Sequence, residues 1–109
     1  MPRDLTLAPR ARDDLDAARL WLMQPGSGPA AWHRLDAIVT AIEDLREHPC
    51  RFPPGAHHGV RERPCAGGYR VFYRVRPDTG HDETAGDVSV LRVYGPGQDR
   101  RGFDSSGSA

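Results

Sequence analysis

A stretch of strict alternation in the middle of the chain, from Gly68 to Arg76, constrains the fold most strongly. It reads Gly-Tyr-Arg-Val-Phe-Tyr-Arg-Val-Arg. In an extended chain successive side chains point to opposite sides, so one side is apolar and the other carries arginine and phenylalanine. We therefore predict a central strand whose apolar face is covered by helices and whose cationic face meets an acidic partner or a phosphate backbone. The apolar set is Tyr69, Val71, Tyr73 and Val75, and the other set is Arg70, Phe72, Arg74 and Arg76.

Two amphipathic helices are predicted before this strand. Pro9 opens the first at a position where a helix tolerates proline, and apolar residues follow it at helical spacing. The second is predicted over 30–47, because the same spacing recurs there and Pro49 stops it. A turn rich in proline and glycine joins the two, which indicates an antiparallel hairpin. The apolar stripes are Ala11, Leu15, Ala18 and Leu22 in the first helix, and Ala31, Leu35, Ile38, Ile42 and Leu45 in the second.

Further strands are predicted at 3–7, 60–65 and 87–94, with irregular connections at 49–59 and 77–86. The order β-α-α-β-β-β predicts a single α+β domain, in which an antiparallel sheet carries the helical hairpin on one face. We expect this domain to span residues 1–103 and a Ser/Gly-rich tail at 104–109 to be disordered. In the last strand we expect Leu91 and Val93 on one face, and the other face to carry Val88, Val90, Arg92 and Tyr94.

Charge is balanced overall but unevenly placed. All 15 basic residues are arginine, and they face 15 acids. Residues 51–76 contain six arginines and one acid, Glu62, which gives a local charge of +5, whereas the segments before and after it are negative. A local field of this kind can steer an acidic partner even when the whole molecule is neutral. For any single arginine, a solvated position on the sheet remains the alternative.

The chain shows no targeting or cofactor signal. Its N-terminus is charged and no segment approaches the roughly 20 apolar residues that span a bilayer, so we expect a soluble, cytoplasmic protein. Cys50 and Cys65 form no close motif, which favours reduced thiols. Together with His57 and His58 they match no zinc spacing, and we expect neither metal nor cofactor.

In order and spacing, several short motifs resemble the RelE/ParE superfamily of bacterial toxins. They are Leu-Arg-Glu-His-Pro at the end of the second helix, Gly-Tyr-Arg-Val-Phe-Tyr-Arg-Val, and Val-Leu-Arg-Val in the last strand. The resemblance covers roughly Leu5 to Phe103. It implies the toxin of a type II toxin-antitoxin system, held inactive by a cognate antitoxin, ParD-like or similar.

RelE-type members of this superfamily cut mRNA on ribosomes. Resemblance to their active site implies that Arg61, Arg63, Arg70 and Arg100 would hold phosphate, as the arginine fork does well. Arginine stays protonated and is a poor general acid or base. Phe103 stands near the position where such nucleases carry a tyrosine or histidine, and phenylalanine cannot move a proton. Glu62 is a candidate base, but alternation turns it away from its neighbours Arg61 and Arg63.

ParE-type members are associated with DNA gyrase poisoning, which asks only for a binding surface of arginine and aromatic anchors. We favour this ParE-like function and growth inhibition, without catalysis. The alternatives are a metal-independent, ribosome-dependent mRNA endoribonuclease and a nontoxic relative with a regulatory role. The residues expected to bind antitoxin or target are Arg61, Arg70, Phe72, Arg74, Arg92, Tyr94, Arg100 and Phe103.

Overall fold

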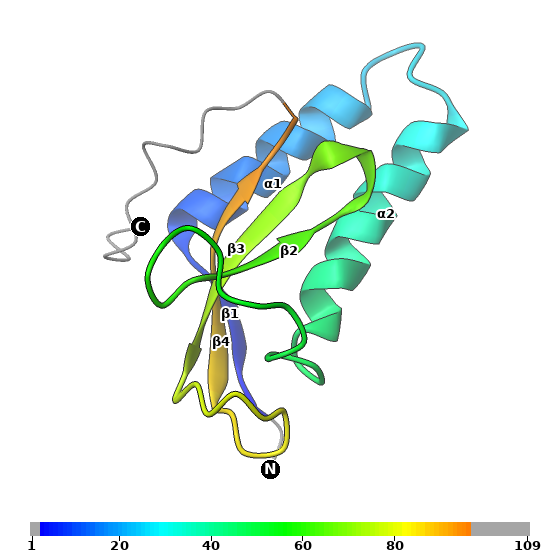
Figure 1. The fold of residues 1–109 in the computed structure, drawn as a ribbon. Coiled ribbons are helices and arrows are strands. Elements are labelled where there is room, and N and C mark those ends of the chain that lie inside the picture. The colour runs from blue at the N-terminus through cyan, green and yellow to red at the C-terminus, as the bar shows by residue number, and fades with distance from the viewer. Residues whose placement is uncertain (1–2, 97–109) are drawn as a thin grey trace.

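The computed structural model describes residues 3–96, which form two helices and a four-stranded sheet (Figure 1). The helices lie together on one face of the sheet, as the α+β prediction requires. Neither helix within the described range combines the length and apolar character that crossing a bilayer needs. In chain order the elements are β1 (Leu5–Leu7), α1 (Pro9–Leu22), α2 (Pro29–Asp44), β2 (Arg61–Pro64), the 3-10 turn η1 (Ala66–Gly68), β3 (Arg70–Arg76) and β4 (Asp87–Tyr94).

The strands are ordered β1-β4-β3-β2, so β3 and β4 are central. The last three strands form the predicted antiparallel meander. The sheet is nevertheless mixed, because β1 runs parallel to β4, with Leu5 beside Val88 and Leu7 beside Val90. The prediction of a wholly antiparallel sheet was therefore wrong at this edge. A three-residue strand carries too short a pattern to specify the direction of its partner.

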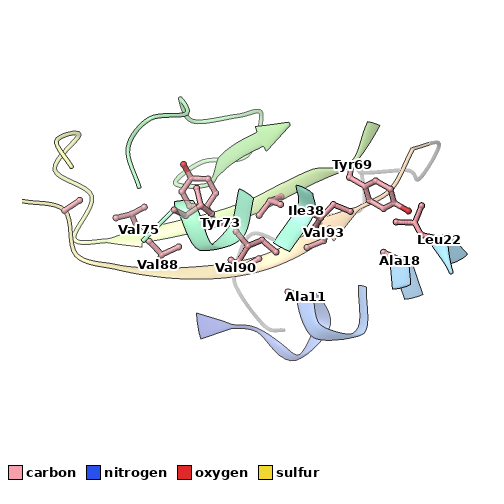
Figure 2. Close-up of a cluster of buried hydrophobic side chains, with 14 of the residues drawn as sticks. Ala11, Ala18, Leu22, Ile38, Tyr69, Tyr73, Val75, Val88, Val90 and Val93 are labelled. Carbon is pink, nitrogen blue, oxygen red and sulfur yellow. The ribbon is translucent and has the colours of Figure 1, made fainter. Parts of the chain in front are cut away.

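The main core lies between the hairpin and the sheet (Figure 2). Pro9 occupies the first turn of α1 as predicted, and the helix stripes face the sheet. The α2 helix ends at Asp44 rather than at the predicted residue 47, because the amide of Leu45 turns to the carbonyl of Ile42 in a tighter turn. From β3 the core receives the predicted set Tyr69, Val71, Tyr73 and Val75, all buried.

A β-bulge in β4 changes which face its side chains occupy. The register against β3 shifts between Phe72, which pairs with Arg92, and Tyr73, which pairs with Val90. Leu91 is the extra residue, and a bulge of this kind lets two successive side chains share a face. Val88, Val90 and Val93 therefore all join the main core. The predicted grouping of Leu91 with Val93 was wrong, because uninterrupted alternation does not hold across the bulge.

We expect Gly86→Ala to destabilise the fold. A Cβ added at Gly86 would lie 2.0 Å from the carbonyl oxygen of Arg76 and 2.4 Å from Cδ of Pro77. Backbone must then move, which costs about 1–3 kcal/mol. At Gly55 an added Cβ would displace only the side chain of Glu62, at the cost of its hydrogen bond from the Ala56 amide, so Gly55→Ala is the control for a side-chain clash. Urea unfolding should show the larger loss for Gly86→Ala, and equal losses would contradict the backbone clash.

Candidate functional site

The structure distributes the arginines of the +5 segment over both faces of the sheet. Directly opposite residues in antiparallel strands share a face. Arg61 pairs with Tyr73 and Arg63 with Val71, which places both arginines on the face that the helices cover, hereafter the helix face. Arg70 lies on the opposite face, hereafter the loop face. The three arginines therefore do not form one cationic surface.

Arg61 fastens the chain after α2 to the sheet. The residue is only 8% exposed, and its Nε and Nη2 donate to the two carboxylate oxygens of Asp78, at 2.8 and 2.9 Å. Its Nη1 donates to the carbonyls of Cys50 and Phe52. The hydroxyl of Tyr73 donates to the carbonyl of Pro49 at 2.8 Å in the same region. Arg61 was expected to bind a partner. In the structure it is buried and its hydrogen bonds go to residues of its own chain.

Arg63 is held in a similar way on the helix face. It donates to Asp44 at the end of α2, at 2.9 Å, and its guanidinium lies over the ring of Phe52 at 4.7 Å from the centroid. A charge-assisted hydrogen bond and a cation–π contact together orient this side chain towards α2. Arg63 thus joins strand to helix.

The loop face has a small apolar cluster of its own. The connection between α2 and β2 crosses this face (Figure 1), and Val60 from it packs with Phe72, Leu91 and Tyr94. Phe72 is 1% and Tyr94 4% exposed. An irregular segment folds over both aromatics, so their rings are buried, and their role in binding antitoxin or target stays a prediction. Glu62 helps to hold this segment, since its carboxylate accepts the amide of Ala56 at 2.9 Å.

Arg92 also belongs to the loop face, and it is tied to α1. Its Nε and Nη2 donate to Asp14 at 2.7 and 3.1 Å, and its guanidinium lies 4.5 Å from the centroid of the Tyr94 ring. Asp14 additionally accepts the amide of Val93 at 2.8 Å. The hydrogen bonds that Arg92 donates to Asp14 raise the pKa of Arg92. This pair was not predicted from the sequence, because Asp14 and Arg92 lie 78 residues apart.

Arg70 and Arg74 are neighbouring sequence-predicted arginines on the loop face of β3. The side chain of Arg70 is 39% exposed and lies 3.7 Å from Glu62, and Arg74 is partly buried. A surface ion pair of this length contributes little to stability, so Arg70 can exchange Glu62 for another acid. Arg100 and Phe103 lie outside the described residues, as does the tail at 104–109.

The metal-ligating and nucleophilic side chains of the described residues are scattered or protonated. Between residues 3 and 96, no group of three or more His, Cys, Asp and Glu side chains is placed to hold a metal ion. Cys50 and Cys65 are free thiols, and burial raises the pKa of each, so both stay protonated at neutral pH. Burial likewise raises the pKa of Tyr73. These groups serve as packing and hydrogen-bond donors.

Two hollows open beside the helices. One of about 390 Å³ lies between α1 and the ends of β3 and β4, and its lining includes Trp21, Tyr69 and Pro96. The other, of about 460 Å³, lies between β1, α1 and α2. Trp21 is 66% exposed, beside Leu20 at 75%. In the sequence, both residues fall at the edge of the apolar stripe of α1, which is consistent with their exposure.

Comparison with known proteins places the chain in a family. Residues 5–99 match the model for the ParE toxin of type II toxin-antitoxin systems, parDE. The chain belongs to the ParE toxin family. The match includes every helix and strand from β1 to β4, so the arginines of both faces and both hollows lie within ParE-like sequence.

The fold agrees with a solved ParE-type structure. A chain from the chromosomal ParDE toxin-antitoxin system of P. aeruginosa superposes with a TM-score of 0.66 at 19% identity, covering 84% of this chain and 92% of that one. Among curated proteins no significant match was found. The RelE/ParE superfamily resemblance is thus confirmed, on its ParE side.

Removing the carboxylate of Asp78 should test the Arg61 fastening. The hydrogen bond from Arg61 holds the pKa of Asp78 below its ordinary value. A depressed pKa contributes stability that is present above the unfolded value, about 3.9, and is lost as pH falls through the folded value. We expect Asp78→Asn to lower the free energy of unfolding by about 1–3 kcal/mol at pH 7.

The difference between wild type and Asp78→Asn should shrink as pH falls below about 4, because the carboxyl is protonated first in the unfolded chain and, at lower pH, in the folded chain. Urea unfolding at pH 7 and pH 3 measures it. Asp36→Asn, at an exposed carboxylate on α2, is the matched control and should change little at either pH. A deficit of equal size at both pH values would contradict an ionic role for Asp78.

Proposed function

We propose that this ParE-family chain is a growth-inhibiting toxin that binds DNA gyrase in the cytoplasm and is neutralised by a cognate, ParD-like antitoxin. One observation carries the choice of binding over hydrolysis. On the helix face, the guanidinium groups of Arg61 and Arg63 are hydrogen-bonded to Asp78 and Asp44, while Arg70 lies on the other face. A phosphate undergoing cleavage needs several donors converging on it. Inhibition by binding does not.

The same arrangement supports a role for the loop face in partner binding. Arg70 is accessible, and its long contact to Glu62 is easily replaced by an acid from a partner. Arg74 lies two residues along the same face of β3. We propose that an acidic segment of the antitoxin contacts these two arginines, with Arg92 and the aromatics behind them holding the surface in shape.

Induced expression of the chain without any antitoxin tests the toxin and its target together. We expect growth arrest with a DNA damage response, and loss of supercoiling activity when purified protein is added to purified gyrase. Arg70→Ala leaves the internal ion pairs of Arg61 and Arg63 in place, so we expect this variant to fold. A loss of gyrase inhibition in Arg70→Ala would then report on binding and not on misfolding. Transcripts cut on translating ribosomes, with gyrase unaffected, would favour the nuclease. Normal growth would favour the nontoxic relative.

Charge reversal tests the antitoxin surface. We expect Arg70→Glu with Arg74→Glu to weaken the complex with the adjacently encoded antitoxin at least about tenfold at low salt, and less at high salt, because exposed charges are screened. Arg10→Glu with Arg12→Glu makes the same charge change at exposed positions of α1 and is the control. Titration calorimetry at two salt concentrations gives both affinities. Equal affinities for the two double variants would overturn the assignment of this surface.

A further inference from the structure

The hollow between α1 and the sheet lies where the described chain ends. Its walls come from Ala17, Ala18 and Trp21 on one side, and from Tyr69 and Val93 on the other. Its volume of about 390 Å³ lies in the range of small-ligand pockets. The lining is mainly apolar. Its one carboxylate, Asp14, lies at one end and already accepts hydrogen bonds from Arg92 and from the amide of Val93.

Pro96 forms part of the rim of this hollow, so the chain leaves the described region at the pocket itself. Pro96 also lies near Gly68. A Cβ added at Gly68 would come within 3.1 Å of the Pro96 Cβ, so the proline lies close to the end of η1. Pro96 and Trp21 both line the hollow.

The segment beyond Pro96 carries one suitable anchor. Residues 97–109 read Gly-Gln-Asp-Arg-Arg-Gly-Phe-Asp-Ser-Ser-Gly-Ser-Ala, in which Phe103 is the single large apolar residue. Phe103 is the seventh residue after Pro96, and an extended chain of that length reaches roughly 24 Å. The lining positions of α1, from Asp14 to Trp21, span only about 10 Å of helix. Reach therefore does not limit contact, and Gly97 and Gly102 permit a reversal of direction.

We propose that Phe103 of the chain's own C-terminal segment docks into this hollow, against Trp21 and Tyr69. An aromatic ring there buries apolar surface and meets two aromatic side chains. Because the segment is tethered at the rim, its effective concentration is in the millimolar range, and a weak contact is then sufficient. Docking covers part of the exposed apolar surface of Trp21, which the solvent otherwise meets. It gives Phe103 a role within the chain that is independent of gyrase and antitoxin.

Tryptophan fluorescence tests the proposal in the full-length chain. Trp21 and Trp32 are the two tryptophans, so Trp32→Phe leaves Trp21 as the single reporter beside the hollow. In that background Phe103→Ala should shift the Trp21 emission to longer wavelength and about double its quenching by acrylamide. Ser106→Ala, three residues further along, is the matched control and should leave both unchanged. An unchanged Trp21 signal in Phe103→Ala would overturn the proposal.

A change on the pocket side keeps the test sharp. Ala17 is an exposed lining residue, so Ala17→Gln fills the hollow without disturbing the core. If the two residues act through one contact, Phe103→Ala should have no further effect on Trp21 in the Ala17→Gln protein. Additive effects would contradict docking in this hollow. Circular dichroism and thermal unfolding confirm that each variant is folded before its fluorescence is compared.

Dilution and a peptide distinguish the tethered segment from other occupants. The emission difference between wild type and Phe103→Ala should be the same at 1 and 100 µM protein, because docking within one chain does not depend on concentration. A difference that disappears on dilution would assign the contact to a second copy and overturn docking in cis. A peptide of residues 97–109 at millimolar concentration should restore the wild-type emission of Phe103→Ala, and the same peptide with alanine at 103 should not. Protection of Trp21 only on adding antitoxin would show that a partner occupies the hollow instead.

Discussion

Burial of β3 on both of its faces is the constraint on which the rest of the molecule depends. Tyr73 is fully buried towards the helices, and the adjacent Phe72 is buried towards the connection that crosses the loop face. Fully burying one such side chain contributes about 1.5–3 kcal/mol. A strand with a large buried side chain on each face needs a cover on both, and a helical hairpin supplies only one. The irregular segment between α2 and β2 must therefore be held in place. Hydrogen bonds from Arg61 to the carbonyls of Cys50 and Phe52, and from the amide of Ala56 to Glu62, hold it.

That requirement explains why so many arginines have internal partners. Arg61 joins β2 to two other parts of the chain, because it binds Asp78 and the carbonyls of Cys50 and Phe52 at once. Arg63 braces the same region against α2. A guanidinium group suits these positions, because its five donors satisfy several acceptors in a fixed plane. Arginines that a sequence suggests for phosphate binding can thus be required by the fold.

Periodicity predicted the parts of this fold that follow from local pattern. The alternation of β3 and the helix stripes placed the main core correctly, since each repeats over several residues. The cover over Phe72 and Tyr94 was not predictable, because an irregular connection has no period from which its path can be inferred. The partners of Arg63 and Arg92 were equally hidden: Asp44 and Asp14 lie 19 and 78 residues away. The charge of +5 sums the residues of one segment, and the acids that pair with Arg61 and Arg63 lie outside that segment.

The bulge in β4 has a consequence for how the family varies in length. Because Leu91 and Arg92 share a face, the strand contains one residue more than its alternation needs. A relative without Leu91 would keep Val90 and Val93 towards the helices and Arg92 and Tyr94 away from them. The loss of one residue at another point of the strand would instead require compensation to keep these faces. Insertions and deletions among related sequences should therefore concentrate at this position, and an alignment that forbids a gap here would pair residues of opposite faces.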